Sequence, residues 1–176
     1  MGHLHLILNH FPVVGLFFTV VLLAFGLKKN SLDLQVASLW AFVAIAIFAT
    51  GAYLTGEFAE EMVEHMPGIT EAVVHKHEVA ARVALAAIGL LGALAIAGLV
   101  HYRKNKTLHT GIMKGLMALS IIAAILAGRT ASLGGQVRHT EIRSKAPAGT
   151  ETGGEGAEAP EEEDSEGDGM PEPTNR

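Results

Sequence analysis

Long apolar segments alternate with short polar stretches along most of this chain. The four longest apolar segments cover residues 4–27, 34–54, 79–100 and 112–133. Each reaches or approaches the roughly 20 residues that a helix needs to cross a ~30 Å hydrocarbon core. Because hydrocarbon offers no hydrogen-bond partner to backbone amides, such segments fold as helices. The pattern therefore predicts an all-α protein, a four-helix transmembrane bundle.

Charge separates this membrane part from the C-terminus. Residues 1–145 carry 12 Lys and Arg against 8 Asp and Glu, whereas residues 146–176 carry one Arg against 10 acids. The second stretch is rich in Glu, Gly and Pro and has no periodic apolar pattern, which is typical of disorder. We predict a membrane domain over 1–145 and a disordered acidic tail over 146–176. The tail is either a solvated segment or a docking segment for a basic partner.

The chain contains no cysteine, and this narrows the possible chemistry. Disulfides, thiolate catalysis, Cys-ligated iron–sulfur clusters and covalent c-type haem attachment are excluded. The N-terminus lacks the basic residues of a secretory signal, and its apolar run is longer than a signal core. We therefore expect residues 4–27 to remain as a membrane span.

The loops between the apolar segments differ in charge. The first and third loops are basic, whereas the second, between residues 54 and 79, is acidic. Basic loops stay in the cytoplasm, so both termini and the second loop are predicted to be periplasmic, in an inner-membrane protein. This topology places seven of the nine histidines on the outer side and leaves His101 and His109 inside.

The ionisable residues His10, Arg82 and Arg129 lie inside the apolar segments, where such residues indicate function. At 1.5 Å per residue, His10, Arg82 and Arg129 lie roughly 9, 5 and 6 Å inside the outer ends of their segments. They are predicted to share one shallow layer of the bundle, with both arginines facing its interior. Tyr53 and Thr55 would add hydroxyl groups near this layer.

The end of the second loop brings more histidines to the same level. Thr70 is a suitable N-cap for a helix that begins near Glu71 and continues into the third apolar segment. His75 would share a face of this helix with Arg82, since the two are seven residues apart. His77 would face about 160° away from Arg82.

Simpler interpretations exist for most of these residues. Arg82 can pair with Glu78 at i,i+4, and Arg129 can extend to lipid head groups. His10 is harder to explain in this way, because apolar residues flank it in the sequence. A structural hydrogen bond to a neighbouring helix is the alternative for His10.

Histidines on different helices of a bundle are suited to holding a b-type haem. His10 with His75 or His77 is the leading axial pair, with His75 slightly favoured, and Arg82 and Arg129 could bind the propionates. The rival is a Zn, Cu or Fe site built from Glu61, His65, His75 and His77. A third hypothesis has no cofactor, only a subunit that binds partners or a proton path. The sequence contains no nucleophile–base triad, phosphate loop or nucleic-acid-binding surface.

Two short motifs resemble those of a known family. The start, His3-Leu-His5-x4-His10-Phe11-Pro12, resembles the His-Phe-Pro start of an uncharacterised family of four-helix bacterial inner-membrane proteins. The segment 133–139, which contains two glycines and ends at His139, is similar to that family's Gly-Gly-x-Leu-Val-Tyr-x-His ending. The resemblance covers about residues 1–143, but the family's first His-Pro pairs and its tyrosine are absent here.

This resemblance implies the four-helix fold and adds His139 to the cofactor-binding candidates. Some members of the family are linked to redox domains, which implies electron transfer. Together these patterns predict a haem-carrying electron-transfer subunit with its cofactor near the periplasmic face, rather than a stand-alone enzyme. A quinone or a redox protein would be its partner, and it could belong to a larger membrane complex.

Overall fold

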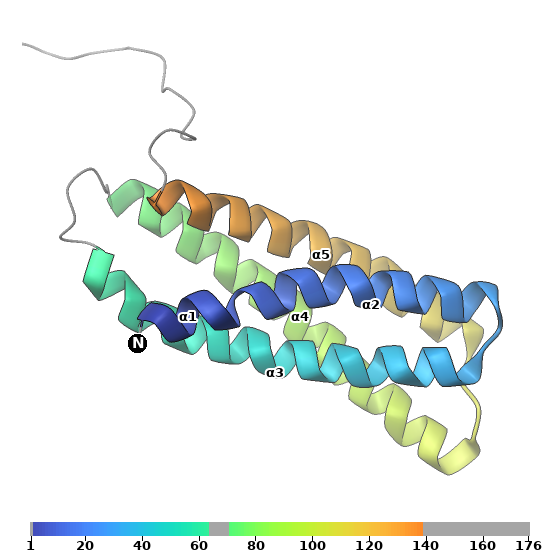
Figure 1. The fold of residues 1–176 in the computed structure, drawn as a ribbon. Helices are drawn as coiled ribbons and strands as arrows, with labels where there is room; N and C mark the ends of the chain where they lie inside the picture. The colour runs from blue at the N-terminus through green and yellow to red at the C-terminus, as the bar shows by residue number, and fades with distance from the viewer. Residues whose placement is uncertain (1, 64–70, 139–176) are drawn as a thin grey trace, which may run out of the picture. The chain divides into compact units, whose positions relative to one another are not determined.

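The computed structural model describes residues 2–63 and 71–138, which form five helices (Figure 1). These are α1 (Gly2–Leu8), α2 (His10–Lys28), α3 (Leu32–Val63), α4 (Glu71–Asn105) and α5 (Thr110–Arg138). Helix α4 begins at Glu71, as the sequence predicts, whereas Thr70, its predicted N-cap, lies outside the described residues. The predicted all-α class is confirmed.

Four stretches of helix are long and apolar enough to cross a membrane: His5–Lys28, Leu32–Gly56, Glu71–Asn105 and Thr110–Val137. The first joins the end of α1 to α2 across a break at Asn9. Pro12 explains this break, because it has no N–H to donate to the Leu8 carbonyl and its ring crowds the preceding turn. The backbone N–H of Asn9 still donates to the His5 carbonyl at 2.9 Å, so the chain continues in nearly the same direction.

Each long helix buries one narrow stripe of residues spaced three or four apart. On α2 the buried stripe is Pro12, Leu16, Thr19, Leu23 and Gly26. Corresponding stripes on α3, α4 and α5 complete a core of leucine, isoleucine, alanine, phenylalanine and methionine side chains. The spacing of three and four residues is that of bundle packing, in which one face of each helix meets its neighbours.

The helices form a closed ring of neighbours. Helix α2 packs against α3, α3 against α4, α4 against α5, and α5 against α2, so α2 and α4 lie on opposite sides of the core. Helix α1 packs mainly on α3, close to the start of the chain (Figure 1). Tight turns connect α2 to α3 and α4 to α5, and Asn30 and Lys106 in them have positive φ angles of 48° and 57°.

The two ends of this bundle differ in chemistry. The end with the two tight turns carries Lys28, Lys29, Arg103, Lys104 and Lys106, and we call it the basic end. The opposite end, where α1 and α4 begin and α3 and α5 finish, is called the histidine end. The chain as a whole divides into the units Met1–Arg143 and Ser144–Arg176. The predicted acidic tail lies outside the described residues.

Candidate functional site

The buried stripes of the helices continue to the histidine end, and two of them reach histidines there. His5 precedes the buried Pro12 by seven residues, and His77 precedes the buried Ala84 by seven. Residues seven apart on a helix lie on nearly the same face. Both histidines are half-buried and lie in the extension of the core, on helices α1 and α4.

His5 is held against α3 by a hydrogen bond and a close contact. Its Nδ1 donates to the backbone carbonyl of Ala52 at 2.8 Å. Its ring lies over Gly56, where an added Cβ would be 3.2 Å from the imidazole Cε1. Ala52 and Gly56 continue the buried stripe of α3, so small residues make room for this imidazole.

His77 is held against α5 in the same manner. Its Nδ1 donates to the carbonyl of Thr130 at 3.1 Å. Its ring lies over Gly134, where an added Cβ would be only 2.9 Å from Cε1. Thr130 and Gly134 follow the buried Ala127 on the inner stripe of α5. Each histidine therefore combines a carbonyl and a glycine from a neighbouring helix.

These hydrogen bonds determine which tautomer each neutral imidazole adopts. A carbonyl oxygen can only accept, so each Nδ1 carries the proton and each neutral ring keeps its lone pair on Nε2. This is the arrangement in which a histidine ligates a metal through Nε2 while its other nitrogen is held by a carbonyl. His5 and His77 also lie close enough to interact electrostatically.

Asn9 adds a polar group one turn deeper. It follows His5 by four residues and so lies on nearly the same face of the chain. Its Oδ1 is buried, and no hydrogen-bond partner for this atom is present in the described part of the chain. The inner side of the chain from α1 to the start of α2 therefore carries two polar side chains, those of His5 and Asn9.

The other residues of the predicted layer face outward. His10, His75, Arg82 and Arg129 are all exposed. His75 and Arg82 do share a face of α4, as the sequence predicts, but that face is the outer one. Arg82 pairs with Glu78 at i,i+4, with a nitrogen–oxygen distance of 3.4 Å.

The expectation that Arg82 and Arg129 face the bundle interior was therefore wrong, and His10, the predicted haem ligand, is also exposed. The helices begin and end near the predicted residues, but their rotation about their axes differs from the prediction. His10 follows His5 by five residues, which turns it about 140° away from the inner stripe. The hydroxyl of Thr55 is also used locally, since it donates to the carbonyls of Gly51 and Ala52 at 2.9 and 3.0 Å.

The rival metal site rests largely on residues that the structure does not describe. His65 lies outside the described residues, and so do the side chain of Glu61 and all of His139. Among the residues that are described, no group of three or more His, Asp or Glu side chains comes together. A zinc ion requires three or four protein ligands, so the described part of the chain supplies too few.

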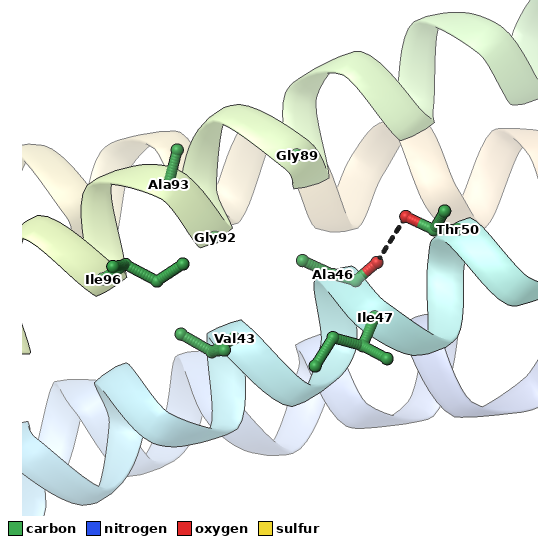
Figure 2. A pocket seen from close by; sticks show the side chains of 8 residues that line it. All are labelled: Val43, Ala46, Ile47, Thr50, Gly89, Gly92, Ala93 and Ile96. Atoms are coloured by element: carbon green, nitrogen blue, oxygen red, sulfur yellow. Dashed lines mark hydrogen bonds between the residues drawn. The ribbon is translucent and has the colours of Figure 1, made fainter.

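A groove of about 330 Å³ lies elsewhere, on the outer surface between α3 and α4. Figure 2 shows its two walls, with Val43, Ala46, Ile47 and Thr50 facing Gly89, Gly92, Ala93 and Ile96. The Thr50 hydroxyl donates to the Ala46 carbonyl at 2.9 Å, so its polar group is already satisfied. No ionisable residue lines this groove, and it is separate from the two histidines.

The model of the DUF2231 family, described as a predicted membrane protein, matches residues 2–141. The chain belongs to the DUF2231 family. The DUF2231 region includes all four membrane helices, both inner histidines and the glycines beneath them. No curated protein and no solved structure matches the chain. Membership in DUF2231 thus establishes a family of membrane proteins and leaves its activity to be inferred from the site.

Sequence reasoning missed His5, Asn9, Gly56 and Gly134 as parts of one site. The helical spacing of three or four residues connects some of these positions to the core. Counted back from Pro12 in such steps, it leads to His5. The same count forward from Ala127 on α5 leads to Gly134. Nothing in the sequence distinguishes this stripe from the others, because α2 is apolar on all of its sides.

Proposed function

We propose that this DUF2231 protein is a membrane-embedded electron-transfer subunit that holds a b-type haem between His5 and His77. The observation that carries the proposal is the matched pair of imidazoles on two different helices, α1 and α4. Each has its Nδ1 bound to a carbonyl, at 2.8 and 3.1 Å, and the residues that the structure describes offer no hydrogen-bond partner to its Nε2, which could therefore ligate iron. His77, rather than His75, is thus the proposed partner on α4.

The number of ligands favours haem over a bare metal ion. A porphyrin supplies four nitrogens to its iron, so two imidazoles complete the coordination. The small residues Ala52, Gly56 and Gly134 around the histidines are consistent with an apolar setting for such a group. When bound, a haem would supply one-electron transfer, and His5 and His77 would hold it through their imidazoles. The site therefore fits an electron carrier better than a catalyst.

A visible spectrum of the full chain purified in detergent tests this proposal directly. The dithionite-reduced protein should show the sharp α-band of a six-coordinate low-spin haem, and its haem content should approach one per chain. The haem should be extractable with acidified acetone, because the chain has no cysteine for covalent attachment. A colourless protein, purified from haem-replete cells, would refute the assignment.

The orientation in the membrane is a second part of the proposal. The basic end carries the Lys and Arg residues that favour the cytoplasm, so the histidine end would face the periplasm. Alkaline phosphatase, which is active only in the periplasm, should be active when fused after residue 146. It should be inactive when fused after residues 30 or 105. Activity at 105 with silence at 146 would place the histidine end in the cytoplasm.

A further inference from the structure

His10 occupies an unusual position for an ionisable residue. It lies five residues, about 7 to 8 Å, inside the first membrane-spanning stretch, which begins at His5. It is exposed, and an exposed residue at this depth of a membrane helix faces lipid. Ionisable side chains in such positions are costly and generally functional. Because the proposed haem site uses the opposite face of the chain, it does not explain His10.

The hydrogen bond of His10 determines what its outward surface can bind. Nδ1 lies 2.7 Å from the carbonyl of Leu6, one turn earlier, and must donate to it. The neutral ring therefore presents the lone pair of Nε2, for which the described residues provide no partner. In hydrocarbon no water is present to donate a hydrogen bond to this nitrogen. A matching ligand is dissolved in the bilayer and carries an O–H or N–H group.

Exposed aromatic residues lie near His10 along the chain and on the neighbouring helix. Phe11, the next residue, stacks on Phe48 of α3 with ring centroids 4.7 Å apart and an interplanar angle of 14°. Both rings remain partly exposed, at 49% and 38%. An acceptor next to exposed aromatic rings suits a planar, aromatic ligand that donates a hydrogen bond.

We infer that His10, Phe11 and Phe48 form a lateral binding site for the headgroup of a membrane hydroquinone. A hydroquinone is apolar enough to reach the site through the bilayer, has an aromatic ring, and donates through its hydroxyl to Nε2 of His10. A phospholipid phosphate fits less well, because it brings only acceptor oxygens to a nitrogen that is itself an acceptor. The choice of a redox-active ligand rests on the proposed electron-transfer function, whereas the geometry of the site does not.

Binding of duroquinol, a short soluble hydroquinone, tests the inference. Equilibrium ultrafiltration of the purified full chain under anaerobic conditions measures its dissociation constant. His10→Leu removes the acceptor and should weaken binding about tenfold, the effect of losing one hydrogen bond in an apolar setting. His75→Leu, which changes an exposed histidine elsewhere at the same end, should leave binding unchanged. A melting curve of each variant verifies that it is folded.

A second ligand that lacks the hydroxyl groups serves as a control for the hydrogen bond. The dimethyl ether of duroquinol keeps the ring but has no hydroxyl, so it should bind the unmodified protein about as weakly as duroquinol binds the His10→Leu variant. Equal binding of the ether and duroquinol, or normal binding by His10→Leu, would overturn the inference. Phosphatidylglycerol provides a third outcome. If it displaces duroquinol, and duroquinol binds no more tightly than its ether, the surface binds lipid and the inference is overturned.

The two proposals fail separately in these experiments. Colourless protein that binds duroquinol through His10 would refute the haem proposal and support the hydroquinone site. Protein with a normal haem spectrum and no duroquinol binding would support the haem proposal and refute the hydroquinone site.

Discussion

Replacing either His5 or His77 with alanine is expected to abolish the sharp α-band of the reduced protein. Each substitution removes one of the two imidazoles whose Nε2 would ligate the iron, so the haem becomes five-coordinate or is lost. Reduced and oxidised spectra of each purified variant, together with the haem content per chain, measure the effect. Adding imidazole to the His77→Ala protein should restore part of the band, because the substitution leaves space where the ring was.

The controls for this prediction come from histidines outside the proposed site. His10→Ala and His75→Ala should keep the band because both side chains are exposed, and His101→Ala should keep it because His101 lies at the basic end. Arg82→Leu should also keep it, because Arg82 is exposed and paired with Glu78. Loss of the band in His10→Ala or His75→Ala, with retention in His5→Ala and His77→Ala, would show that the exposed histidines ligate the haem.

The membrane helices could be predicted from the sequence because their signal is length. Four apolar segments of about 20 residues each become spanning helices, whatever faces they present to one another. The structure also has α4 begin at Glu71, well before its apolar segment and near the predicted residue. These features depend on neighbouring residues only and not on packing between helices.

The inner faces could not be predicted in the same way. In a soluble helix the polar face shows which side is buried, but α2 is apolar all round because lipid covers its outside. Depth along the segment therefore pointed to His10, and no feature of the sequence pointed to His5 as a ligand. Packing decides between them: Gly56 on α3 accommodates the imidazole of His5, and His10 is turned away. The positions of the helices along the chain were predictable, whereas their rotation needed the structure.

The support of His77 by α5 leads to the second large effect. Gly134→Ala would place a Cβ 2.9 Å from Cε1 of His77, closer than such atoms approach in folded proteins. The ring must move, and its hydrogen bond from Nδ1 to the Thr130 carbonyl, 3.1 Å long, must stretch or break. Overpacking of this kind costs about 1–3 kcal/mol. Disturbing the support of a metal-ligating histidine weakens metal binding about 10- to 100-fold.

Gly128 provides the matched control for this variant. It lies on the same helix, six residues earlier, and a Cβ added there would meet nothing within 4 Å. Gly128→Ala should therefore keep the haem affinity and raise helix stability slightly, because alanine favours the helix over glycine. Haem titration of the stripped proteins and their melting temperatures in detergent would separate the two variants. Equal haem affinity in both would show that contact with Gly134 does not position His77 for ligation.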